Sequence, residues 1–193
     1  MKPCLKISLK DIQSNWKLIN KASKGKAAAV IKANAYGLGM LAIARALLEV
    51  GCNYFYVANI DEAIQLRKKY NSAKISIAIF EGYLEGNQKL YNEFNLIPII
   101  NSLDQLIRLN SFAVEKPFPR AILNIDTGMN RLGLNQEEKI FLLKNKDILK
   151  NVKLDFIMSH LANAQEHEDK KNLIQLDKLK NFSSNLPDIK LSL

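Results

Sequence analysis

Short apolar stretches recur along the 193-residue chain at nearly regular intervals. Each stretch is dense in β-branched or aromatic residues, which is typical of strands that are buried on both faces. We therefore predict seven strands, at residues 27–31, 54–57, 75–80, 96–100, 121–125, 154–158 and 189–193.

The segments between these stretches have helical spacing. Residues 41–50 are followed by Gly51, a type of residue that often ends helices. Residues 61–67 begin with acidic side chains, which favour a helix N-terminus, and Ser102 is a candidate N-cap for the segment after it. Residues 136–143 follow the same pattern. A strand and a helix alternate six times before the seventh strand, and this order predicts an α/β protein with parallel strands.

Two architectures fit this order: a (β/α)8 barrel of the TIM type and an open, doubly wound sheet. No GxGxxG motif follows the first predicted strand, which weakens the dinucleotide-binding form of the open sheet. A complete barrel contains about 250 residues. A barrel built from residues 11–193 would therefore be incomplete, with about seven strands. Residues 5–9 alternate apolar and polar side chains, so we expect residues 1–10 to form a strand outside the barrel.

Charge and cysteine content argue against several classes of function. The chain has 28 Lys and Arg against 19 Asp and Glu, a formal net charge of +9. The basic residues are scattered, and no basic run interleaves with aromatic residues, so we predict no nucleic-acid partner. Cys4 and Cys52 match no metal-binding spacing, so we expect free thiols and no metal site. No stretch approaches the roughly 20 apolar residues of a membrane span, and the N-terminus has no long apolar segment. We therefore predict a cytoplasmic protein without a membrane partner.

The first candidate motif is a lysine that follows the first predicted strand, in residues 30–39. In a parallel barrel, active sites gather at the carboxyl ends of the strands. A partly desolvated lysine amine at that position is a good nucleophile, suited to a Schiff base with an aldehyde such as pyridoxal phosphate (PLP). Taken alone, Lys32 is equally compatible with a surface lysine at the end of a strand.

The second candidate motif, residues 124–133, places Arg131 in a glycine-containing loop after the fifth predicted strand. A guanidinium can hold a carboxylate through two parallel hydrogen bonds, as an enzyme acting on amino acids requires. Taken alone, Arg131 also fits a surface arginine, and Asp126 fits a helix N-cap or a turn residue.

The third candidate motif, residues 158–164, places His160 after the sixth predicted strand. The imidazole could stack on a flat cofactor ring or form a hydrogen bond to it, although a lone histidine is more often structural. His167 lies in a polar run, and we expect it to be exposed. Because all three motifs follow predicted parallel strands, we expect them to converge at one end of the barrel, where the carboxyl ends of the strands lie.

At this point the sequence resembles a known family, the alanine racemases. Residues 30–39 resemble the PLP-lysine motif of that family, and residues 125–133 and 158–164 resemble two further motifs in the same order. The resemblance covers essentially the whole chain. It implies the N-terminal part of a PLP-dependent enzyme of fold type III: an incomplete (β/α)8 barrel that stops before the barrel and a β-rich C-terminal domain are complete.

The resemblance also implies an activity and residue roles. The enzymes interconvert L- and D-alanine by removing and returning the α-proton of an aldimine between alanine and PLP, which supplies D-alanine for peptidoglycan. Lys32 would hold PLP through a Schiff base and act as the catalytic base on one face of the substrate. Tyr36 would bind the PLP phosphate, and His160 would lie against the pyridine ring. Arg131 would contact the PLP hydroxyl group and the substrate carboxylate.

The chain departs from the family pattern at Asn124, where many members carry a lysine that is often carbamylated. Because an asparagine cannot form a carbamate, we expect a bound anion such as chloride beside Arg131. The family forms homodimers, and its second base, a tyrosine, belongs to the C-terminal part. The strand at residues 5–9 would pair with that part and would otherwise be an exposed edge.

Three other interpretations remain open at this stage. The chain could be a non-enzymatic PLP-binding barrel of PLP homeostasis, a decarboxylase of the same fold, or an inactive remnant. We predict that residues 1–193 alone racemise alanine little or not at all, because one of the two proton-transfer groups is missing from them. Comparing PLP binding with alanine racemisation would distinguish the racemase from the first alternative.

Overall fold

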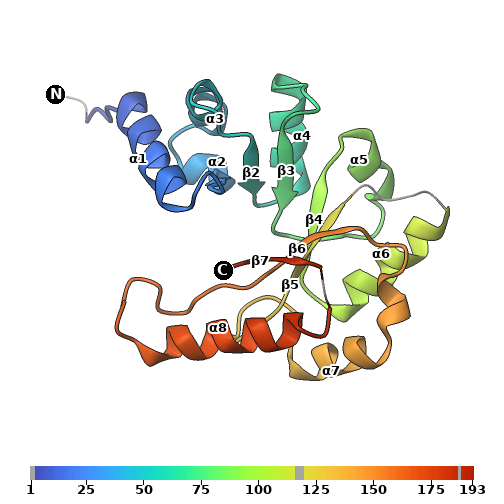
Figure 1. The fold of residues 1–193 in the computed structure, drawn as a ribbon. Helices are drawn as coiled ribbons and strands as arrows, with labels where there is room; N and C mark the ends of the chain where they lie inside the picture. The colour runs from blue at the N-terminus through green and yellow to red at the C-terminus, as the bar shows by residue number, and fades with distance from the viewer. Residues whose placement is uncertain (1–2, 116–119, 187) are drawn as a thin grey trace. The chain divides into compact units, whose positions relative to one another are not determined.

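The computed structural model describes residues 3–115, 120–186 and 188–193. It divides into two compact units. The first comprises Met1–Phe80 and Phe94–Leu96, and the second comprises Glu81–Glu93 and Ile97–Leu193. Strands and helices alternate along the chain (Figure 1). Each of the seven predicted strands is present among the described residues.

The first unit contains three strands with helices between them. Its elements are α1 (Leu9–Ala22), β1 (Ala29–Val30), α2 (Lys32–Tyr36), α3 (Met40–Glu49), β2 (Tyr54–Val57), α4 (Ile60–Lys69) and β3 (Ser76–Ile79). The strands are parallel, and Phe55 in the middle strand pairs with Ala29 of β1 and Ile77 of β3. Phe55 and Ile77 are fully buried, as expected of strands covered on both faces.

The predicted helix at residues 61–67 is confirmed as α4, and local side chains explain its ends. The Asn59 side chain accepts a hydrogen bond from the backbone N–H of Glu62 and caps the N-terminus. Basic side chains occupy the last turn, where the negative end of the helix dipole favours them. One of them, Arg67, is only 5% exposed. Its guanidinium donates hydrogen bonds to the carbonyl oxygens of Ser72, Ile75, Phe94 and Asn95.

The second unit contains the remaining four strands. Its elements are α5 (Gln88–Glu93), β4 (Ile97–Ile100), α6 (Leu103–Glu115), β5 (Ala121–Asn124), α7 (Gln136–Lys144), the 3-10 helix η1 (Lys146–Leu149), β6 (Leu154–Met158), α8 (Lys170–Ser183) and β7 (Lys190–Ser192). These strands are parallel and follow one another in chain order. Every residue of β4 and β5 is buried, whereas β7 is exposed throughout. The buried core of this unit therefore lies around β4 and β5.

The predicted N-terminal strand is not a strand in the structure. Residues 3–8 have no regular secondary structure, and helix α1 begins at Leu9 because the Ser8 hydroxyl caps the N–H of Asp11. An isolated strand is not stable without a neighbour for its backbone groups. Leu5 is 74% exposed. Residues 1–2 lie outside the described residues, and pairing with a further domain stays a prediction.

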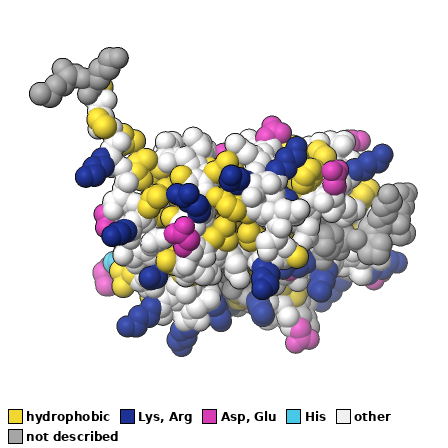
Figure 2. Space-filling model, turned by 90° about the horizontal axis from the view of Figure 1, so that it is seen from above, with side chains coloured by type: hydrophobic (Ala, Val, Ile, Leu, Met, Phe, Trp, Pro, Cys, Tyr) yellow, Lys and Arg dark blue, Asp and Glu magenta, His cyan; other side chains and the backbone are white. Residues whose placement is uncertain are grey.

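The surface gives no sign of one strongly basic region on the face drawn in Figure 2. There, lysine and arginine side chains lie singly or in small groups among apolar, acidic and other groups. Within the described ranges, no helix is both long enough and apolar enough to cross a membrane.

Candidate cofactor site

Lys32 lies where strand pairing ends in the first unit. The N–H of the preceding residue, Ile31, donates to the carbonyl oxygen of Tyr56 in β2 at 2.9 Å. The Lys32 Nζ lies 4.9 Å from the centre of the Phe80 ring, and Phe80 directly follows β3. That ring stacks on Tyr56, with 5.3 Å between the centroids. A cation–π contact therefore holds the amine near the carboxyl ends of β1 and β3.

The segment α2, between Lys32 and Gly37, is a left-handed turn. Ala33, Asn34 and Ala35 have φ of 52–54° and ψ of 44–50°, and Tyr36 has φ of 55°. This conformation costs about 1–2 kcal/mol for each residue that carries a Cβ, so the surrounding contacts must hold it. The turn places Lys32 at its start and Tyr36, which is 65% exposed, at its end.

The predicted arginine motif forms a loop after β5, residues 126–133, which we call the Arg131 loop. A parallel bridge between Ile125 and Leu134 closes it. Asp126 is a turn residue whose Oδ1 accepts hydrogen bonds from the backbone N–H groups of Gly128, Met129 and Asn130, at 2.9–3.1 Å. Gly133 has φ of 105°, and a Cβ there would lie 2.7 Å from the backbone N of Asp126. Glycine is therefore required where the loop closes.

A buried lysine supports the Arg131 loop. The Nζ of Lys139, in α7, donates to the carbonyl oxygen of Asp126 at 2.7 Å. Burial lowers the pKa of Lys139, and the negative charge of Asp126 offsets only part of this effect. Burial opposes ionisation of Asp126, but the three backbone donors and Lys139 together hold the pKa of that carboxyl below its ordinary value. The loop is therefore held from inside by a carboxylate and a lysine.

Arg131 itself is exposed, whereas Asn124, at the end of β5, is buried. The Asn124 Nδ2 donates to the Oδ1 of Asn101 at 2.8 Å, so part of its hydrogen-bonding capacity is used within the protein. The bound anion expected beside Arg131 stays a prediction.

His160 is exposed and follows β6, and a glutamine fixes its loop, residues 159–163, which we call the His160 loop. Gln175 of α8 is only 1% exposed. Its Nε2 donates to the His160 carbonyl oxygen at 3.0 Å and to the Thr127 Oγ1 at 3.2 Å. Its Oε1 accepts from the N–H of Ala162 at 2.9 Å, and Thr127 also bonds to Ser159 at 2.8 Å. One buried side chain therefore ties the Arg131 loop to the His160 loop.

Each unit thus assembles its own set of predicted residues. The first unit brings Lys32 and Tyr36 together in one turn, and the second joins Arg131 and His160 through the loops that carry them. The sequence reasoning missed the supporting side chains Glu62, Lys139 and Gln175. Gln175 had a detectable signal, since it is a polar residue spaced by four and seven from the buried Leu179 and Phe182 of the same helix.

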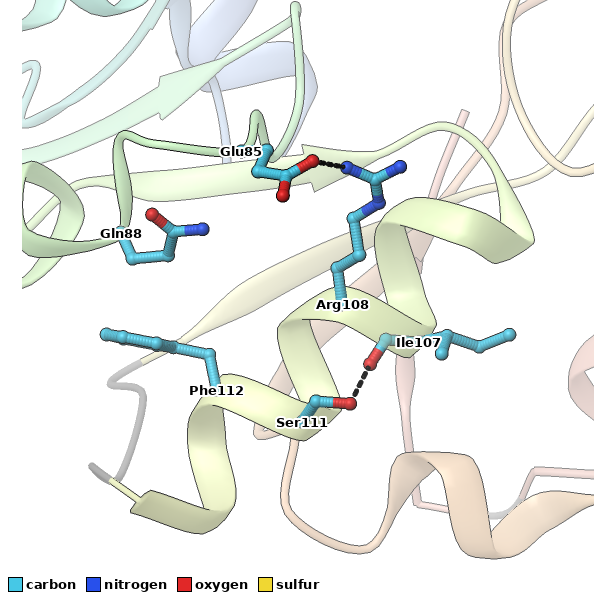
Figure 3. Close-up of a pocket in the computed structure, with 6 residues that line it drawn as sticks. All are labelled: Glu85, Gln88, Ile107, Arg108, Ser111 and Phe112. Carbon is cyan, nitrogen blue, oxygen red and sulfur yellow. Dashed lines mark hydrogen bonds and ion pairs between the residues drawn. The ribbon is translucent and has the colours of Figure 1, made fainter.

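Among the described residues, no group of three His, Cys, Asp or Glu side chains could hold a metal ion. An open depression of about 460 Å³ in the second unit contains none of the predicted site residues (Figure 3). Figure 3 shows Arg108 pointing to Glu85, with which it forms an ion pair. The open depression is lined by Glu85, Gln88, Ile107, Arg108, Ser111 and Phe112.

Parallel strands that alternate with helices along the chain define a class: α/β domains of the barrel type. Comparison with known proteins makes the class specific. Residues 7–192 match the family "Alanine racemase, N-terminal domain". The chain belongs to this family.

Among curated relatives, alanine racemase from Rickettsia typhi is 37% identical over 192 residues, which are 98% of this chain and 47% of the relative. The crystal structure of alanine racemase from Bartonella henselae with covalently bound pyridoxal phosphate is 35% identical, with a TM-score of 0.90, over 96% of this chain and 54% of that one. The biosynthetic alanine racemase from Pseudomonas aeruginosa is 28% identical, with a TM-score of 0.80, over 96% of this chain and 51% of that chain.

The chain therefore spans about half the length of the relatives that it matches. The likeness to the Bartonella structure confirms the predicted fold class, an incomplete (β/α)8 barrel with seven parallel strands.

Proposed function

We propose that this chain supplies the PLP-binding lysine of an alanine racemase, and that the racemase interconverts L- and D-alanine. The observation that carries the proposal is the position of Lys32. Its amine lies over an aromatic ring at the carboxyl ends of β1 and β3, at the start of a turn that ends in an exposed tyrosine. The Bartonella relative, which holds PLP covalently, supports the choice of cofactor.

The described residues fit PLP by their chemistry. A lysine amine can bind the aldehyde, a tyrosine hydroxyl can donate to the phosphate, and a guanidinium can pair with the carboxylate of an amino acid. When bound, PLP makes the α-proton of an amino acid acidic by delocalising the resulting negative charge. In this proposal Lys32 holds the cofactor and moves the proton on one face, and Tyr36 binds the phosphate. Arg131 orients the substrate carboxylate, and His160 lies against the cofactor ring.

The test is to trap PLP on the chain. The purified protein is incubated with PLP, reduced with borohydride, digested, and the modified lysine is identified by mass spectrometry. We expect the label at Lys32, its loss in Lys32→Ala, and an unchanged yield in the control Lys26→Ala, which alters an exposed lysine just before β1. Labelling of other lysines to the same total yield in Lys32→Ala would refute the assignment.

Turnover is tested separately, with an assay in which D-amino-acid oxidase reports D-alanine formed from L-alanine. We expect little or no turnover from residues 1–193 and measurable turnover from a protein of the relatives' full length. PLP binding without racemisation by such a full-length protein would favour the non-enzymatic PLP-binding barrel. The homodimer, the supply of D-alanine for peptidoglycan and the cytoplasmic location remain predictions from the resemblance.

A further inference from the structure

The left-handed turn at Ala33–Tyr36 needs an external support. Four consecutive residues with a Cβ have φ of 52–55°, a conformation that such residues rarely adopt. Within the turn, Ala35 N–H donates to Ile31 O at 2.9 Å and Gly37 N–H donates to Ala33 O at 3.1 Å. The residues that follow add Leu38 N–H to Ala35 O at 3.1 Å, Gly39 N–H to Asn34 O at 2.9 Å and Met40 N–H to Asn34 Oδ1 at 2.8 Å, but none of these bonds uses the N–H of Asn34. The residues between Lys32 and Tyr36 would therefore favour a different conformation on their own.

The support comes from the carboxylate of Glu62, in the first turn of α4. Its Oε1 accepts a hydrogen bond from the N–H of Asn34 at 2.9 Å, in the middle of the left-handed turn. Its Oε2 accepts from the N–H of Ala58, just after β2, at 2.8 Å. The backbone of Glu62 is itself fixed, because its N–H donates to the Asn59 cap at 3.0 Å. One side chain thus ties the turn to the end of β2 and to the start of α4.

A second glutamate in the chain shows what an ordinary structural role looks like. Both α4 and α7 begin with Asn-x-x-Glu. In α7, Glu138 completes a capping box with Asn135, and its other oxygen accepts from the N–H of Leu103 at 2.8 Å, at the start of α6. Glu138 therefore has the same helix position and also two backbone donors, but it supports no turn with positive φ and no residue assigned to the cofactor.

We propose that Glu62 is a positioning residue: its carboxylate holds the strained turn so that Lys32 and Tyr36 are presented together to PLP. The inference rests on the proposed function. A carboxylate suits this task, because both oxygens accept and neither donates, whereas an amide at this position would bring an N–H against one of the two backbone donors. The function of Glu62 is thus to fix geometry, without itself touching the cofactor.

The experiment compares Glu62→Gln with Glu138→Gln in the 193-residue chain. The readouts are PLP affinity by absorbance titration, the yield of borohydride trapping at Lys32, and the melting temperature without PLP. We expect both variants to melt earlier than the parent chain, but only Glu62→Gln to weaken PLP binding, by about tenfold or more, as for the loss of charge-assisted hydrogen bonds. Equal PLP affinities of the two variants would overturn the inference.

A rescue variant separates support of the turn from general damage. Glycine adopts positive φ without a steric cost, so Ala33→Gly added to Glu62→Gln should recover part of the lost PLP affinity. If Glu62→Gln alone fails to fold, PLP affinity is measured on the double variant Ala33→Gly, Glu62→Gln instead. No recovery in a folded double variant would overturn the inference. If the parent chain shows no labelling at Lys32, the proposed function fails first and the inference falls with it.

Discussion

Replacement of Gln175 by leucine tests whether one buried amide holds the Arg131 loop and the His160 loop together. The substitution keeps a side chain of similar size but removes three hydrogen bonds, to Thr127, His160 and Ala162. Thr127 keeps its bond to Ser159, so the main losses fall on the backbone groups of the other two residues. At about 1 kcal/mol for each lost bond, and more where the group stays buried without a partner, the loss is about 2–4 kcal/mol.

The added burial of leucine offsets about 1 kcal/mol of this loss, which leaves a destabilisation of about 1–3 kcal/mol. In a chain of this size, 1 kcal/mol shifts the melting temperature by about 2–4 °C, so we expect a decrease of about 2–12 °C. The assay is thermal unfolding followed by far-UV circular dichroism, with urea unfolding to measure the free energy directly. The matched control is Gln136→Leu, which alters an exposed glutamine at the start of α7.

A second readout links this network to the site. If Gln175 positions His160, the variant should also bind PLP more weakly at a temperature where it is fully folded. A melting temperature for Gln175→Leu no lower than that of the control would refute the claim that the network contributes net stability. A large loss of stability with unchanged PLP affinity would restrict Gln175 to a structural role.

Two further predictions concern the Arg131 loop. Asp126→Asn keeps the acceptor oxygen but removes the charge. The folded-state pKa of Asp126 lies below its ordinary value, so the charge stabilises the fold at pH values above the unfolded-state pKa. This contribution to stability disappears as the pH falls through the folded-state pKa. Urea unfolding should therefore show the parent chain to be more stable than Asp126→Asn at about pH 7, and this advantage should shrink as the pH is lowered below the ordinary value of 3.8. An advantage that does not change with pH would refute a charge effect. Gly133→Ala should destabilise the chain by more than about 1 kcal/mol. The effect should exceed that of the control Gly25→Ala, because both glycines have positive φ but, of the two, Gly133 alone has backbone atoms within 3 Å of the added Cβ. Equal urea midpoints for the two alanine variants would contradict this reasoning.

The alternation of strands and helices was predictable because each unit of the pattern carries a local signal. Buried strands are dense in β-branched residues. Helices α4, α6 and α7 begin directly after Asn59, Ser102 and Asn135, whose side chains cap them. The N-terminal segment shows the limit of such signals. An alternating pattern at residues 5–9 predicted a strand, but a strand also needs a partner, and the local cap at Ser8 starts a helix at Leu9.

The positions of the candidate site residues followed from the strands, but their conformations did not. Alanine favours right-handed helix, so no local signal in Ala33 or Ala35 predicts a left-handed turn. The turn depends on Glu62, which is 28 residues away in the sequence. Likewise, Gln175 reaches Thr127 across 48 residues. Contacts of this kind depend on the folded arrangement of helices on strands, which residue patterns within one segment do not contain.

The two sets of site residues share one physical property, although different side chains produce it. Lys32 and Tyr36 are presented by a turn that Glu62 holds, and Arg131 and His160 by loops that Asp126 and Gln175 hold. In each set the group that would meet a ligand is distinct from the buried or part-buried group that fixes its backbone. Binding that must first order a loop loses affinity, so supports made before the ligand arrives conserve it. Variants of the supports should therefore weaken binding without removing any group that touches the ligand.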